Sequence, residues 1–114
     1  NQAGNFIEPS IETVSNAAAG FADDIDPDLR ARIVDAPGDE SYPISGFTWL
    51  LAYEEQQDEA KAIALTRMLW WAVTDAQELN AELDYAPVPD EIGAISREMI
   101  RDIKFNGEPA FPGE

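Results

Sequence analysis

One group of acidic residues has a spacing that metal sites use. Asp24, Asp26 and Asp28 alternate with other residues, as the first ligands of a calcium-binding loop do. The rest of that pattern fails, because Leu29 stands where the loop needs glycine and Asp35 stands where it needs glutamate. The sequence therefore favours a solvated acidic loop over a metal site.

A second acidic group could in principle supply an acid–base pair: Glu54, Glu55, Asp58 and Glu59. No feature of the sequence places two of these carboxylates in a cleft. Acidic residues suit the first turn of a helix, because they complement the partial positive charge of its N-terminus. This group therefore predicts the start of a helix.

Nucleophilic and imidazole chemistry are absent from the sequence. It has no cysteine and no histidine, which excludes thiol chemistry, Cys/His zinc sites and imidazole catalysis. No other nucleophile stands beside a base. We therefore expect that the protein is not an enzyme, and we assign no catalytic residue, no metal ligand and no cofactor.

Two further features could form a ligand site. Trp49, Tyr53, Trp70 and Trp71 could stack on a sugar or a base, but aromatic residues at such spacings more often pack in a core or against another part of the protein. Residues 35–41, "DAPGDES", hold a single glycine. They lack the repeated glycines of a phosphate-binding loop and predict a turn.

Length and charge restrict the possible partners. The chain has 114 residues, enough for one small domain, and a net charge of −16. Nucleic acid is an unlikely partner because phosphate contacts need Lys and Arg, and an anionic membrane surface is unlikely for the same reason. No long apolar span is present. The chain opens with Asn1 rather than Met, and we interpret it as a piece of a longer protein.

Helical periodicity predicts most of the secondary structure. Helices are expected over 10–21, 58–73, 75–83 and 89–103. Ser10 should cap the first helix and Gly20 should end it. Thr74 with Gln77 fits a capping box for the third helix. The apolar stripes of the second and fourth helices are Leu65, Met68, Leu69 and Ala72, and Ile92, Ile95, Met99 and Ile103.

Strands are fewer and shorter. Residues 5–8 and 31–34 are weak candidates, and 104–114 should form an extended tail. Residues 47–53, "FTWLLAY", are the strongest candidate. Their nearly continuous apolar character is typical of a strand buried on both faces. A short apolar run can also be helical, but the threonine and aromatic residues favour a strand. A few short strands with about four helices resemble half of a larger α/β domain.

Several motifs occur in a characteristic order. They are N-x-A-G-x-F followed by P-S, "YPI" before the apolar strand, W-A-x-T-x-A-Q, and L-x-Y-A-P-x-P. This ordered set, up to about Ile103, resembles the C-terminal segment of the periplasmic phosphate-binding proteins of bacterial ABC phosphate importers. By this resemblance residues 1–114 are a single segment of a solute-binding-protein lobe.

The resemblance implies a fold and a role. The fold would be part of a type II periplasmic-binding-protein clamp, whose chain leaves one lobe and returns to finish it. The "YPI" connector would lead into a strand that inserts beside strands from the N-terminal half. The implied function is to complete the lobe that helps form the phosphate cleft. The implied partners are inorganic phosphate, in the full-length protein only, and the transporter permease. The implied location is extracytoplasmic, either periplasmic or lipid-anchored.

The ligands of phosphate do not transfer to this chain. The family binds phosphate through an Asp, an Arg, hydroxyl groups and an S-G-T helix start, which all belong to upstream regions. The arginines at 30, 32, 67, 97 and 101 do not stand in the matching context, so we assign no phosphate-binding residue. The alternatives are an independent acidic protein-interaction module and a relative that binds another oxyanion or a small solute. Self-association of the isolated segment is also expected, because an unpaired strand edge templates association.

Overall fold

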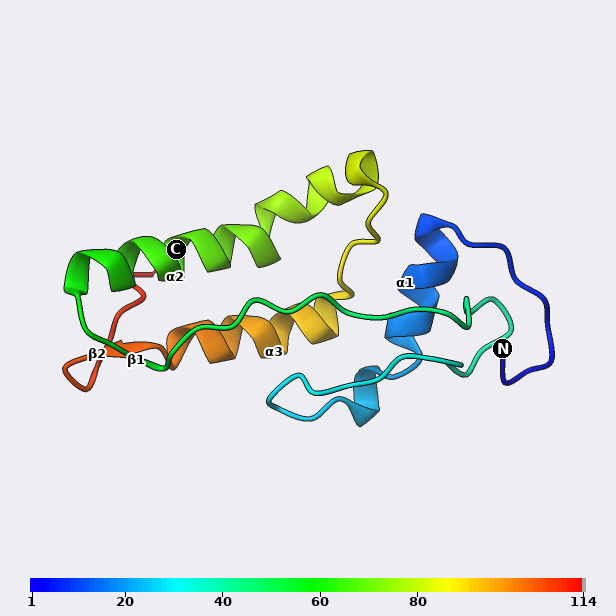
Figure 1. Cartoon of the computed structure of the whole chain (residues 1–114), viewed down its shortest axis with the longest axis horizontal. Helices are drawn as coiled ribbons and strands as arrows, with labels where there is room; N and C mark the ends of the chain where they lie inside the picture. Colours follow the sequence, from blue (N-terminus) through cyan, green and yellow to red (C-terminus); the bar gives the residue numbers. More distant parts are fainter. Residues whose placement is uncertain (114) are drawn as a thin grey trace.

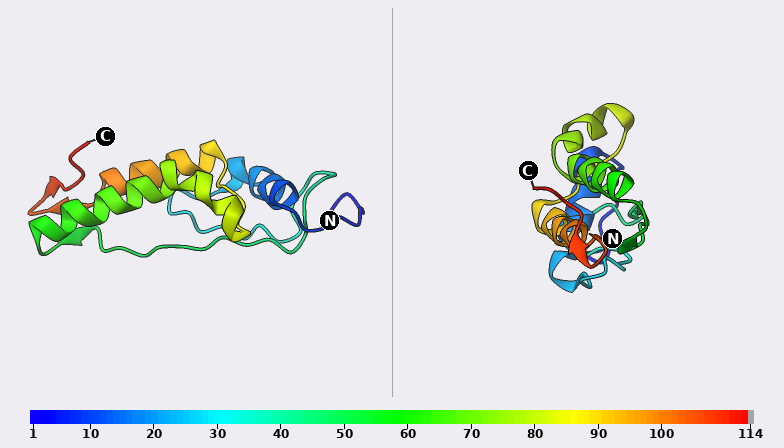
Figure 2. Two further views of the ribbon diagram at one scale, coloured as in Figure 1. Left: turned by 90° about the horizontal axis from the view of Figure 1, so that it is seen from above. Right: turned by 90° about the vertical axis from the view of Figure 1, so that its left-hand side faces the viewer.

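The structure is a computed structural model that describes residues 1–113. Its α-helices are α1 (Ile11–Ala19), α2 (Glu59–Val73) and α3 (Asp90–Arg101), its 3₁₀ helices are η1 (Ala22–Asp24) and η2 (Asp75–Leu83), and its strands are β1 (Glu55–Gln56), β2 (Lys104–Phe105) and β3 (Glu108–Pro109). The molecule measures 51 × 28 × 18 Å, with α1 toward one end and the strands at the other (Figure 1, Figure 2). The expected α/β class is confirmed for this small domain.

The first two helices begin where the sequence predicts. Ser10 caps α1, because its Oγ accepts a hydrogen bond from the Thr13 amide at 3.1 Å. Asp58 caps α2 in the same way, by accepting from the Lys61 amide at 2.9 Å. Gly20 ends α1 as expected, but in the right-handed conformation. An added Cβ at Gly20 would lie 2.9 Å from the Pro37 carbonyl oxygen, so close approach of the backbone favours glycine there.

The predicted capping box at Thr74 is wrong. The Thr74 hydroxyl donates to the Trp70 carbonyl at 2.7 Å, and no side-chain cap forms. Gln77 instead joins two segments, because its amide nitrogen donates to the Ala72 carbonyl at 2.7 Å and its oxygen accepts from the Val88 amide at 2.8 Å. With the threonine hydroxyl bound to the preceding helix, residues 75–83 form a 3₁₀ helix.

The sheet is small and has three strands in the order β1-β2-β3. β1 pairs with β2 in parallel, and β2 pairs with β3 in an antiparallel hairpin. Asn106 and Gly107 both have positive φ, as a tight two-residue hairpin turn requires. Residues 104–109 are therefore a hairpin, where the sequence analysis expected an extended tail. Glu114, the last residue of that expected tail, lies outside the described residues.

Two buried clusters hold the fold together. Cluster A contains Ala62, Leu69, Ile100, Ile103 and Ala110. Cluster B contains Ala18, Ile25, Ile33 and Ile92. Helix α3 contributes to both, through Ile100 at one end and Ile92 at the other. This arrangement makes α3 the element that links the two halves of the molecule.

The apolar stripes are partly different from those predicted. Leu65 and Leu69 face cluster A as expected, but Met68 is 51% exposed. Ala62 is buried in its place. In α3, Ile100 rather than Met99 is buried. The reason is that α2 is covered mainly on its α3 side, so the buried stripe is narrower than the apolar stripe of the sequence.

The predicted strands at 5–8, 31–34 and 47–53 do not form within the described residues. Residues 47–53 instead run as a long uncoiled segment that ends in β1 (Figure 1). A strand is stable only when its backbone groups pair with a neighbour. β1, β2 and β3 pair only with one another, so residues 47–53 have no strand beside them.

Candidate functional site

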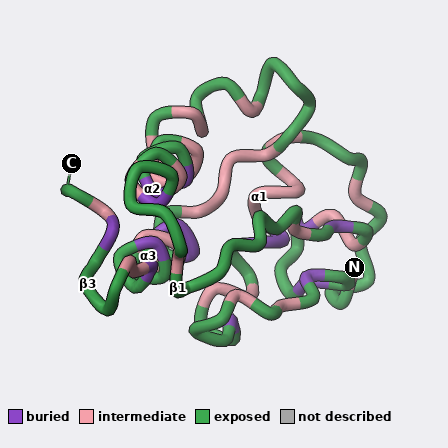
Figure 3. Tube along the Cα trace, turned by 60° about the vertical axis from the view of Figure 1, so that its left-hand side comes forward, coloured by how far each residue is buried: buried purple, intermediate pink, exposed green. Residues whose placement is uncertain are grey.

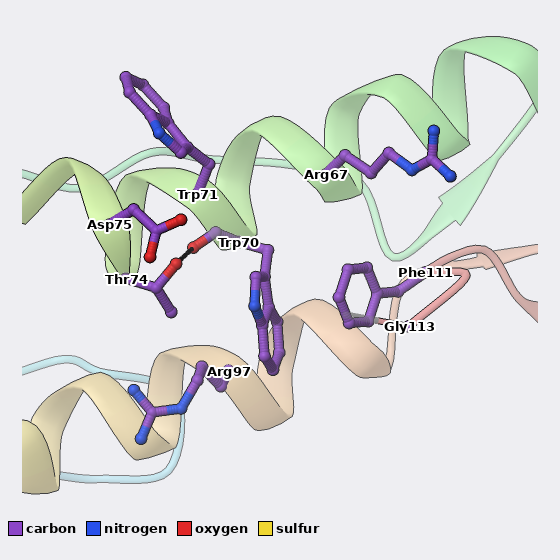
Figure 4. A pocket seen from close by; sticks show the side chains of 8 residues that line it. All are labelled: Arg67, Trp70, Trp71, Thr74, Asp75, Arg97, Phe111 and Gly113. Carbon is purple, nitrogen blue, oxygen red and sulfur yellow. Dashed lines mark hydrogen bonds between the residues drawn. The ribbon is translucent and has the colours of Figure 1, made fainter.

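An open groove lies between α2, α3 and the C-terminal residues, with a volume of about 620 Å³ (Figure 4). It is lined by Arg67, Trp70, Trp71, Thr74, Asp75, Arg97, Phe111 and Gly113. Among the described residues, no helix is long and apolar enough to cross a lipid bilayer.

Aromatic stacking builds one wall of this groove. The Trp70 and Phe111 rings stack with centroids 4.4 Å apart and 22° between their planes. The Arg101 guanidinium lies 4.9 Å from the centroid of the Trp70 ring, a distance typical of a cation–π contact. Both faces of Trp70 are thus in use, so this ring is a packing element rather than a free stacking platform.

The two other arginines of the groove do not form an anion clamp. Neither Arg67 nor Arg97 has an ion pair with another described residue. Their guanidinium groups point away from one another, on opposite sides of Trp70 (Figure 4). Arg97 folds back along α3, where a Cβ added at Gly93 would lie 3.3 Å from its Nη1. In this arrangement the pair does not converge on one small anion, and sequence reasoning offered no signal for the groove.

The four aromatic residues chosen from the sequence are not brought together. Trp70 packs against cluster A, as expected for core packing. Trp71, Trp49 and Tyr53 are exposed, so the prediction of core packing is wrong for these three within this chain. The Trp49 ring nitrogen donates to the Leu29 carbonyl at 3.0 Å. Contact with another part of the protein stays a prediction for the exposed rings.

The acidic groups have structural partners in place of a ligand. Within the described residues, no group of three or more side chains could hold a metal ion. Asp28 pairs with Arg30 at 3.0 Å. Glu54 lies 3.5 Å from the Lys104 amine, and Glu55 accepts from the Gly107 amide at 3.3 Å. The second acidic group therefore closes the sheet and begins α2.

The turn at 35–41 is held from the N-terminus of the chain. The Asn1 side chain donates 3.1 Å hydrogen bonds to the carbonyls of Gly38, Asp39 and Ser41. The Ser41 hydroxyl donates to the Pro37 carbonyl at 2.7 Å. These bonds fix carbonyl oxygens, whereas a phosphate loop presents amide hydrogens. The geometry therefore supports the interpretation of this segment as a turn.

Several proteins similar to this chain are named phosphate-binding proteins. The phosphate-binding protein PstS of Methanocaldococcus jannaschii is 30% identical over 120 residues, which cover 91% of this chain and 30% of that protein. PstS of Haemophilus influenzae is 26% identical over 105 residues, which cover 91% of this chain and 31% of that protein. The resemblance to the phosphate-binding protein family is confirmed.

The similar segment also occurs in a protein with a different name. A putative serine/threonine-protein kinase/receptor of Acanthamoeba polyphaga mimivirus is 28% identical over 111 residues, covering 93% of this chain and 7% of that protein. No protein-family model matches the chain, and no solved structure gives a significant match. The chain spans about 30% of the length of the PstS relatives named above.

Proposed function

We propose that this chain serves as the C-terminal segment of the phosphate-binding subunit of an ABC importer. Its role there is to complete the lobe that helps form the phosphate cleft. The observation that carries the proposal is similarity over 91% of the chain to proteins named phosphate-binding, each about three times as long. In this proposal the protein works outside the cytoplasm, its soluble partner is inorganic phosphate, and its membrane partner is the importer permease.

The segment acts as scaffold in this proposal, without a catalytic role. Two observations support a scaffold role. The arginines of the groove diverge, and the acidic side chains of residues 54–58 are bound within the fold. The rival function is an acidic protein-interaction module, which the match to a kinase/receptor-named protein favours. The two differ in whether phosphate binding depends on this segment being joined to the rest of a binding protein.

The isolated 114-residue chain is expected not to bind phosphate. Its net charge of −16 repels a dianion, and its groove offers no converging pair of arginines. Calorimetric titration of the chain with inorganic phosphate at low salt is the measurement, and sulfate serves as the control anion. A saturable micromolar signal with phosphate would contradict the scaffold role.

A further inference from the structure

Residues 46–53 have free backbone groups along an extended segment. Within residues 1–113, the backbone N–H and C=O groups of residues 46–52 make no hydrogen bond to another described residue. The side chains are also uncovered, with Leu51 at 96% exposure and Tyr53 at 86%. Figure 3 shows the chain that leads into β1 as mostly exposed. Free backbone groups beside exposed apolar side chains are the features of an edge that pairs with another strand.

The segment continues directly into a strand that is already part of a sheet. β1 begins at Glu55 and pairs with β2 on one side only, because β1 is the first strand in the order β1-β2-β3. A partner strand that pairs with residues 46–53 would therefore extend an existing sheet rather than start a new one. This lowers the cost of pairing, since an isolated two-stranded ribbon is only marginally stable in water.

The charge pattern allows a second copy of the same segment to be that partner. Residues 41–53 carry no charged side chain, and Glu54 and Glu55 follow them directly. In an antiparallel pair centred on Leu50, residue 46 faces residue 54 and residue 47 faces residue 53. Glu54 of each copy then faces Gly46 of the other. A parallel in-register pair would place the glutamates of the two copies side by side, and like charges in that position destabilise a sheet.

We propose that residues 46–53 are the edge through which two copies of this chain pair as antiparallel β-strands centred on Leu50. The pairing satisfies the backbone groups that are free in the single copy. It also covers the apolar side chains of this segment. The net charge of −16 on each copy opposes approach at long range, so added salt, which screens exposed charges, should strengthen the pairing.

Sedimentation velocity across a range of concentrations tests the proposal with a matched pair of variants. Leu51→Lys places a charge within the paired segment, a device that blocks edge pairing. Leu83→Lys makes the same change of side chain at a site that is 67% exposed and lies on η2, outside the segment. We expect the original chain and Leu83→Lys to dimerise, and Leu51→Lys to dimerise about tenfold more weakly or not at all.

Hydrogen exchange of the amides of residues 46–53 supplies the second measurement. They should exchange freely at low concentration and become protected as the dimer forms. A chain that stays monomeric at every concentration and salt level would overturn the proposal, whether those amides exchange freely or are protected. Dimerisation that Leu51→Lys leaves unchanged would also overturn it, because the contact would then lie elsewhere. Each outcome is independent of whether the chain serves in phosphate transport.

Discussion

Leu69→Ala is expected to lower the free energy of unfolding by about 2–5 kcal/mol. Leu69 is 8% exposed and belongs to cluster A, where α2 meets α3 and the C-terminal hairpin. Truncation removes buried methyl groups and leaves a cavity that the surrounding helices fill only in part. Urea denaturation followed by circular dichroism at 222 nm, a wavelength that reports helix, gives the change (the ~222 nm helix band).

Met68→Ala is the matched control for this prediction. Met68 precedes Leu69 in α2, is of similar size and is 51% exposed. Its truncation should change the stability by no more than about 0.5 kcal/mol, as is usual at exposed positions. Equal losses for the two variants would show that the face of α2 assigned to the core is wrong.

Ile33→Ala is expected to cost a similar amount, about 2–5 kcal/mol. Ile33 is 1% exposed and sits in cluster B, although it lies in a segment without helix or strand. The neighbouring residue offers the control, because Val34 is 50% exposed. Val34→Ala should therefore stay within about 0.5 kcal/mol of the original chain. Thermal unfolding of both variants is the measurement.

The two core variants together test whether the molecule unfolds as one unit. Clusters A and B are joined through α3, which supplies Ile100 to one and Ile92 to the other. In a single cooperative transition, both variants should shift the whole curve to lower temperature. A separate early transition in Ile33→Ala alone would mean that the N-terminal half opens independently of the α2–α3 pair.

Local sequence patterns predicted the helices well, since their signals are local. Ser10 and Asp58 cap helices with hydrogen bonds to amides three residues away, and such signals need no knowledge of the tertiary fold. The stripes of α2 and α3 were predicted less well. Which residues of an apolar stripe are buried depends on where the neighbouring helix lies. Met68 and Met99 are exposed for that reason.

The strands could not be predicted in the same way, because pairing depends on distant residues. Residues 47–53 have the composition of a buried strand, yet they stay unpaired and exposed in this chain. The short hairpin at 104–109 was missed, although Asn106-Gly107 is a strong local signal for a two-residue turn. The groove beside Trp70 had no sequence signal, since it arises only where α2, α3 and Phe111 meet.

The most direct test of the proposed function is a chimera with a relative of known name. The segment of Methanocaldococcus jannaschii PstS that aligns with this chain covers 30% of that protein. It is replaced by the 114 residues of this chain, and phosphate binding is measured by calorimetry. A chimera that carries a scrambled 114-residue insert of the same composition is the control. Saturable phosphate binding by the chimera, absent from both the control and the isolated chain, is the predicted result. A chimera that folds, as judged by a cooperative thermal transition, yet binds no phosphate would contradict the account of this chain as a lobe-completing segment.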